Sequence, residues 1–256
     1  MKTIKTTIIL LILSFNSLNL FAKSGLELGI FVPIGTSISL HTFDSSEYGN
    51  NSGFNQYVEN NAKKTKAGFE IGILSQAGYS FQINRDFSIS LLGELGYFRD
   101  SINYGLKDTE TNSYIFVMKN SVYNTFDSLL IGAIPKLNYK NFSFSLGFGV
   151  KIPLYAEINY SSKNKSIGYI AENITTIKAN KMKDYFKHQA IPFIKFVFDY
   201  SFYSSSKFDL VLSGYFNYDF PIYYQNKNSN NNINPIEKLS SIDLGIQFGA
   251  KIRPMG

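Results

Sequence analysis

The 256-residue chain contains no cysteine, no tryptophan and only two histidines. Without cysteine, the chain cannot form disulfide scaffolds, thiolate metal sites, iron–sulfur clusters or a catalytic thiol. No group of histidine and acidic residues has the spacing of metal ligands, so we expect neither a metal nor another cofactor. Long hydrophobic runs are also missing: no stretch after residue 22 approaches the ~18 uninterrupted apolar residues of a transmembrane helix.

Aromatic residues make up 16% of the chain, with 18 Tyr and 23 Phe, while hydrophobic residues reach 44% and charged residues 17%. This composition favours β structure and a chain with enough apolar material to fold. The formal charge of +6 is modest. The lysines are scattered or lie in predicted loops, with no basic helix and no aromatic RNA-binding motif, so we expect no nucleic-acid partner.

The first 22 residues have the layout of a secretory signal peptide. Lys2 and Lys5 precede an apolar run from Ile8 to Leu13, and a polar stretch ends at Ala22, after which we expect cleavage. The alternative, a membrane anchor, would need about 20 apolar residues, and this run is far shorter. We therefore expect an exported protein whose residues 23–256 form one domain.

The rest of the chain alternates with a period of two. Between Leu26 and Leu40 every even position except Thr36 carries a large aliphatic residue, and most odd positions carry small or polar residues. Such alternation predicts a β-strand with one apolar face. The same pattern predicts seven further strands, at about 69–83, 87–97, 129–139, 142–154, 194–202, 208–220 and 242–252.

The spacing of these strands separates the candidate architectures. Short turns at 84–86, 140–141 and 204–207 alternate with long segments at about 42–66, 99–121, 156–188 and 221–239, as in outer-membrane barrels. A soluble lipocalin-like barrel, the alternative, would turn its apolar face inward. We predict an all-β fold: an eight-stranded antiparallel up-and-down transmembrane β-barrel with three short periplasmic turns and four long surface loops.

Charged residues of the strands lie opposite the apolar rows. In hydrocarbon each would cost a few kcal/mol, so we expect them to point into the lumen and pair there. This predicted lumen network consists of Glu27, Glu70, Glu94, Lys136, Lys151, Lys195, Asp199, Asp209 and Lys251.

Aromatic residues gather near both ends of the predicted strands, as in the interfacial girdles of membrane barrels. Those beside the short turns are Tyr79, Phe81, Phe87, Tyr139, Phe142, Phe202 and Phe208, and those near the opposite ends are Tyr97, Tyr123, Phe216 and Tyr218. Four prolines, Pro33, Pro135, Pro153 and Pro192, fall within or beside strands, where we expect bulges or strand margins.

With its signal peptide, eight strands, three tight turns, four long loops and C-terminal strand, the chain resembles the small outer-membrane barrels typified by the OmpA membrane domain, OmpX and the opacity proteins. The resemblance implies an outer-membrane location and assembly by the barrel-assembly machinery, which reads the last strand. Here Asp243, Gly245, Phe248 and Ile252 carry that strand's alternation, but residues 253–256 follow where the family usually has a terminal aromatic residue. No periplasmic domain of the OmpA type is expected after the barrel.

The third long segment is the most basic. It contains Lys163, Lys165, Lys178, Lys181, Lys183 and Lys187 against three acidic residues, so it could bind anionic headgroups or a host polyanion; the alternative is an ordinary solvated loop. Within it, Ile170, Ile174, Ile177 and Phe186 recur at roughly helical spacing, which predicts a short amphipathic helix.

These observations predict a surface-exposed structural or adhesion protein that is not an enzyme and is monomeric. Its expected partners are outer-membrane lipid, the assembly machinery and host or envelope surface ligands. One alternative is a lipid A-modifying enzyme that uses His41 or His188, with Ser37, Ser39 and Glu70 near His41. A second is a narrow pore, although side chains fill the interior of an eight-stranded barrel.

Overall fold

The computed structural model describes residues 25–43, 55–56, 58–59, 63–106, 109–111, 116–164, 169–205, 208–224 and 237–252. The predicted signal peptide, Lys165 and residues 253–256 lie outside these ranges. Among the described residues, the longest helical stretch is far too short to cross a membrane.

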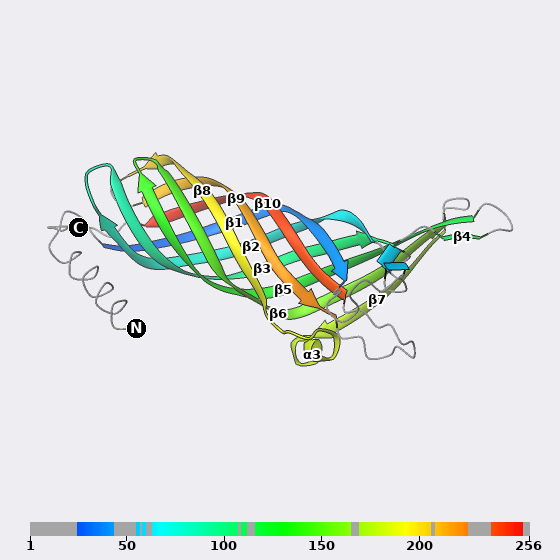
Figure 1. The fold of residues 1–256 in the computed structure, drawn as a ribbon. Helices are drawn as coiled ribbons and strands as arrows, with labels where there is room; N and C mark the ends of the chain where they lie inside the picture. The colour runs from blue at the N-terminus through cyan, green and yellow to red at the C-terminus, as the bar shows by residue number, and fades with distance from the viewer. Residues whose placement is uncertain are drawn as a thin grey trace.

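Eight long strands form a closed antiparallel barrel (Figure 1). Each strand pairs with the next along the chain, and the last pairs with the first. The strands are β1 (Gly25–Phe43), β2 (Lys64–Gln82), β3 (Phe87–Gly105), β5 (Phe116–Tyr139), β6 (Phe142–Asn164), β8 (Ile191–Ser204), β9 (Phe208–Tyr223) and β10 (Glu237–Ile252). The predicted fold class is confirmed.

The register gives the stagger of the strands around the barrel. Starting at Leu28, the paired residues are Ala77, Gly93, Ala133, Phe148, Ile194, Tyr218, Ile242 and finally Ile38. The circuit therefore returns to β1 displaced by 38 − 28 = 10 residues. Such a shear requires strands that are strongly tilted to the barrel axis.

The outer face of the barrel is a belt of large apolar side chains. Ile30, Leu91 and Phe144 are each more than half exposed on the isolated molecule. The aromatic residues beside the short turns also point outward, Tyr139 and Phe142 among them. An apolar belt that encircles the molecule is not stable against water, and it has the alternation of a lipid-facing barrel wall.

Two of the four prolines lie at a register shift or a strand end, and the other two lie inside strands. Pro153 lies at a register shift between β5 and β6, and Pro192 lies at the start of β8, as predicted. At Pro33 and Pro135 the prediction of a bulge or margin is wrong, because both lie inside strands whose register does not change. One ladder is instead interrupted for two residues at each: β1–β2 skips 32–33, and β5–β6 skips 134–135.

The second and third long segments are largely strand rather than loop. β3 continues to Gly105, and β5 already begins at Phe116, with the short β4 (Thr109–Thr111) beside it. β6 continues to Asn164, and β7 (Ile170–Lys178) folds back on it. Together these strands form a projection beyond one end of the barrel (Figure 1).

The amphipathic helix predicted in the third segment is not formed by the residues that suggested it. Ile170, Ile174 and Ile177 lie in β7, where Ile170 and Ile174 are exposed. A 3₁₀ turn at Ala179–Lys181 and the one-turn helix α3 (Met182–Tyr185) follow that strand. The pairing of β7 with β6 satisfies more backbone groups than an isolated short helix would.

Candidate functional site

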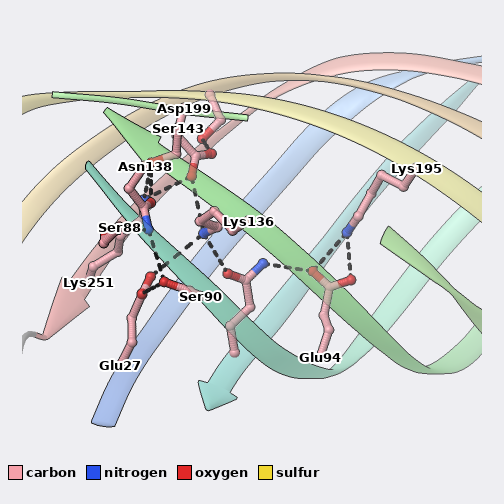
Figure 2. Close-up of polar contacts among 12 residues, drawn as sticks. Glu27, Ser88, Ser90, Glu94, Lys136, Asn138, Ser143, Lys195, Asp199 and Lys251 are labelled. Carbon is pink, nitrogen blue, oxygen red and sulfur yellow. Dashed lines mark hydrogen bonds and ion pairs between the residues drawn. The ribbon is translucent and has the colours of Figure 1, made fainter. Parts of the chain in front are cut away.

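Inside the barrel, near the short-turn end, lies a layer of charged and hydroxyl side chains (Figure 2). The Lys136 ammonium lies 3.2 Å from Asp199 Oδ2 and 3.9 Å from Glu27 Oε1. Lys251 Nζ lies 2.8 Å from the same Asp199 oxygen, and the Ser90 hydroxyl donates to Glu27 Oε2 at 2.6 Å. Two cations and two carboxylates from four strands, together with Ser90 of β3, thus hold opposite walls of the barrel together.

A buried pair lies further along the lumen. Lys195 on β8 approaches both oxygens of Glu94 on β3, at 2.8 and 2.7 Å. The amide of Gln76 donates to Glu94 Oε1 at 2.9 Å, and its oxygen accepts a bond from Lys136 at 3.3 Å. Gln76 therefore connects this pair with the layer below it.

The next layer contains one lysine among several carboxylates. Lys151 Nζ lies 2.8 Å from Asp100, 2.6 Å from Asp219 and 3.6 Å from Asp243. Asn217 donates to both Asp219 and Asp243, at 2.8 and 2.7 Å. Glu70 accepts a hydrogen bond from the Tyr215 hydroxyl in the same part of the lumen. We call Glu70, Asp100, Lys151, Asp219 and Asp243 the Lys151 layer.

All nine charged residues of the predicted lumen network are buried, and Asp209 accepts a 2.6 Å bond from Ser204. Three further buried acids, Asp100, Asp219 and Asp243, belong to this network although they were not predicted as members of it. Asp100 lies six residues after Glu94 in β3 and therefore on the same face of the strand. The alternation would have identified Asp100 as a lumen residue if the predicted strand had extended that far. Asp243 was assigned only to the assembly signal.

At the extracellular end the barrel interior becomes apolar. A cluster of twelve buried side chains joins six barrel strands with β7, α3 and the segment after α3. We call this cluster the cap; it consists of Ile102, Tyr104, Val122, Phe126, Ala156, Ile158, Ile177, Met182, Phe186, Ile191, Ile222 and Leu239. Burial raises the pKa of the Tyr104 phenol to about 12. The cap fixes the projecting β6–β7 hairpin onto the barrel.

His41 lies beside the cap, with its ring 5.7 Å from that of Tyr104. Its Nε2 lies 2.7 Å from Glu237 Oε1, and the Lys63 ammonium contacts the same oxygen. Burial lowers the pKa of His41 to about 3, with a further contribution from the Lys63 charge. Burial likewise lowers the pKa of Lys63 to about 7. The imidazole is therefore neutral at physiological pH.

The catalytic arrangement considered for His41, with Ser39 and Glu70 as its partners, is not formed. Ser39 donates to the backbone oxygen of Asn103, and Glu70 contacts Tyr215 rather than His41. The carboxylate at His41 belongs to Glu237 instead. His188 is exposed, and its ring packs edge-on against Tyr223 with centroids 5.6 Å apart.

The lysines of the third segment occupy two places. Lys163 lies on β6 opposite Ile170 of β7, and Lys178 ends β7 opposite Tyr155. Lys181, Lys183 and Lys187 follow in the turn that carries α3, and all five of these lysines are exposed. Over the described ranges, no group of His, Asp and Glu has the geometry to hold a metal ion.

The predicted assembly strand forms β10, which closes the barrel against β1. Phe248 and Ile252 point outward and are about half exposed, whereas Asp243 is fully buried in the Lys151 layer. Gly245 faces the lumen, where a side chain would collide with Tyr215. The role of this strand as an assembly signal stays a prediction.

No family model matches the chain, and no curated protein matches it. Among solved structures it is similar to Ail, the attachment invasion locus protein of Yersinia pestis, in complex with the heparin analogue sucrose octasulfate (11% identity, 89% of this chain and 99% of that chain, TM-score 0.33). It is also similar to OprG of Pseudomonas aeruginosa, with 13% identity over 91% of this chain and 99% of that chain and a TM-score of 0.36. A third similar structure is the outer membrane protease OmpT of Escherichia coli, with 8% identity over 89% of this chain and 96% of that chain and a TM-score of 0.35. At such identities and scores these likenesses indicate nothing about what this chain binds or catalyses.

The architecture rests on the chain's own geometry. Strand order, closure of β10 on β1, the outward apolar belt and the inward charges each follow from the described residues. By these features, the chain has the fold of the small eight-stranded outer-membrane β-barrels.

Proposed function

We propose that this protein is a non-catalytic binding protein of the outer-membrane surface, and that its extracellular projection binds a polyanionic ligand. The observation that carries the proposal is the exposed basic segment formed by residues 178–187. It contains Lys178, Lys181, Lys183 and Lys187 against a single acid, Asp184. Its charge is therefore 4 − 1 = +3.

The segment is held in place from beneath. Ile177, Met182 and Phe186 are almost completely buried in the cap, while the lysines between them are exposed. The rings of Phe186 and Tyr224 lie 5.1 Å apart, and Phe186 also forms a bridge with Tyr224 in the backbone pairing. Lysines on an anchored backbone bind an extended anion with less loss of conformational entropy than lysines on a free loop.

The test is binding of heparin, as a sulfated polyanion, to the refolded barrel in nanodiscs. Replacing Lys178, Lys181, Lys183 and Lys187 together with Gln is expected to abolish salt-sensitive retention on heparin resin. The matched control changes the exposed Lys64 and Arg99 to Gln, outside the segment, and should be retained like the unaltered protein. Equal retention of the fourfold variant and the unaltered protein would contradict the proposal.

The two alternatives have less structural support. His41 is buried, neutral and paired with Glu237, so it does not face a substrate. The lumen is crossed by the two ion-paired layers, by the Lys195–Glu94 pair and by the cap, which opposes a pore. Unchanged lipid A in cells that express the protein, and no discrete conductance in planar bilayers, are the expected results. Altered lipid A that reverts with His41→Ala, or stepwise conductance, would restore the respective alternative.

A further inference from the structure

The lipid-facing wall contains a continuous apolar groove with a volume of about 730 Å³. Two neighbouring rows of outward side chains form its sides, and within each row every residue pairs with the next one across the sheet. One row contains Leu137, Phe144 and Phe198, and the other contains Leu146, Phe196 and Phe216. The residues between the rows, such as Val197 and Tyr215, point into the lumen, so their backbone is the floor of the groove.

The groove is open at Gly214. This glycine continues the first row after Phe198, and a Cβ placed on it would meet nothing within 4 Å. A larger residue would fill the groove at this point. Phe144, Phe196 and Phe198 stand around the gap with roughly half of their surface exposed. The groove therefore offers aromatic walls and no polar side chain on its outward sides, which suits a hydrocarbon chain.

The position of the groove in the membrane follows from the strands. Its lower end is at Ile89 of β3, three residues after the turn residue Asp86, and its upper end is at Leu244, eight residues before the end of β10. Crossing from β3 to β10 takes five strand spacings, or about 24 Å. Because the strands tilt by about 40°, the groove rises by about 15 Å along the membrane normal, somewhat more than half of the roughly 25 Å apolar belt. It thus spans the periplasmic leaflet.

Two cations lie at the lower end of the groove. Arg85 and Lys140 are exposed in adjoining turns, which are joined by a 2.8 Å bond from the Lys140 amide to the Asp86 backbone oxygen. Lys140 Nζ lies 5.3 Å from the centre of the Tyr139 ring, in the interfacial girdle. With Asp86 as the one acid of these two turns, the rim carries a net positive charge at headgroup depth.

We propose that this groove binds one acyl chain of an anionic phospholipid of the periplasmic leaflet, with the lipid phosphate at Arg85 and Lys140. The apolar walls accept the chain, and the two cations select the headgroup. The site is independent of the polyanion binding proposed above, because the two lie at opposite ends of the barrel.

The test uses phosphatidylglycerol with a diazirine in one acyl chain, reconstituted with the full mature barrel in nanodiscs of phosphatidylcholine. Photocrosslinks are expected to concentrate on residues 135–137, 144–146, 196–198 and 214–216. Gly214→Leu should reduce crosslinking there to the level of the remaining wall. Gly93→Leu is the matched control, because Gly93 is also exposed on the outer face but lies outside the groove.

A second comparison tests the headgroup. Arg85→Gln with Lys140→Gln should remove the preference for phosphatidylglycerol over the same diazirine probe with a choline headgroup, by about fivefold per cation. Heat-modifiable migration selects variants that fold, and Phe198→Ala, which removes one wall, replaces Gly214→Leu if that variant fails. Crosslinks spread evenly around the barrel, a second copy crosslinked at the groove, or unchanged labelling of both groove variants would each overturn the proposal.

Discussion

The interior of this barrel has two regions that differ in chemistry. Within the lipid belt the inside combines charged layers, with Lys136, Lys151 and Lys195 buried among carboxylates, with small apolar clusters such as that around Phe31 and Leu74. Above the belt the inside is apolar, with Phe126 and Val122 completely buried in the cap. The difference follows the solvent outside, because lipid takes the apolar face of a strand and water takes the polar face. The same backbone alternation thus yields two kinds of core.

The two cores should fail in different ways, and the largest effect is expected at Lys151. Lys151→Met leaves Asp100, Asp219 and Asp243 without their shared cation in a buried layer. Removing one partner of a buried ion pair costs about 3–5 kcal/mol. The urea midpoint of the heat-modifiable band should therefore fall markedly at pH 8. Lys64→Met, at an exposed site, is the control; equal midpoints for both variants would show that this layer does not stabilise the barrel.

Loss of a cap residue should open one end without unfolding the barrel. Phe126→Ala removes a buried ring that lies 5.8 Å from that of Phe186, at a cost of about 3 kcal/mol. The variant should still migrate as a folded barrel, but limited proteolysis should cut within β7 much faster. Phe144→Ala, on the lipid face, serves as the comparison. If the heat-modifiable band disappears with Phe126→Ala, the cap and the barrel are one cooperative unit.

Acid should weaken the cap through His41, with a smaller effect. Its pKa is about 3 in the closed structure and near 6.5 when the imidazole is in water. Below pH 6.5 the open form therefore binds a proton that the closed form does not, so the free energy of opening falls as the pH falls toward 3. Hydrogen exchange near Leu239, corrected for its intrinsic rate, should speed up between pH 7 and pH 5. His41→Gln, which keeps a donor but does not titrate, should remove this dependence; its persistence would exclude His41 as the cause.

The basic segment above the cap should contribute least to stability. Changing the exposed Lys178 and Lys181 to Gln should alter the free energy of unfolding by less than about 0.5 kcal/mol. Urea titration of the heat-modifiable band measures this. A larger loss would place these lysines among the groups that hold the cap.

Alternation was sufficient to predict the barrel but not the cap. In β3, Leu91 and Leu95 point to lipid, whereas further on Ile102 and Tyr104 point inward. The alternation does not stop at the membrane surface; the apolar residues move to the other face. Because the outward apolar row ends there, the sequence pattern predicted a loop at 99–121. A reversal of the apolar phase is the signal that marks where strands leave the lipid.

The remaining errors come from features that alternation does not encode. In β6 a register shift near Pro153 moves even-numbered residues inward, so Leu154 is exposed while Ala156 and Ile158 belong to the cap. The sequence shows only an unbroken even-numbered row. Likewise, Asp100 and Lys151 meet across the lumen from strands that are not neighbours. Such a contact depends on barrel diameter and stagger, which a single strand pattern does not contain.

The unequal lengths of the strands also determine how far the protein reaches. β5 has 24 residues and thus measures about 80 Å, while about 9–11 residues of a tilted strand suffice to cross the hydrocarbon. Because the Tyr139 end of β5 lies at the periplasmic girdle, the residues that are not needed to cross the hydrocarbon all lie on the extracellular side of the membrane. β5, β6 and β7 therefore form a projection on one side of the barrel that extends roughly 30 Å above the bilayer. β1, with 19 residues, ends closer to the bilayer. A neighbouring surface that approaches the cell would meet this projection before the ends of the other described strands.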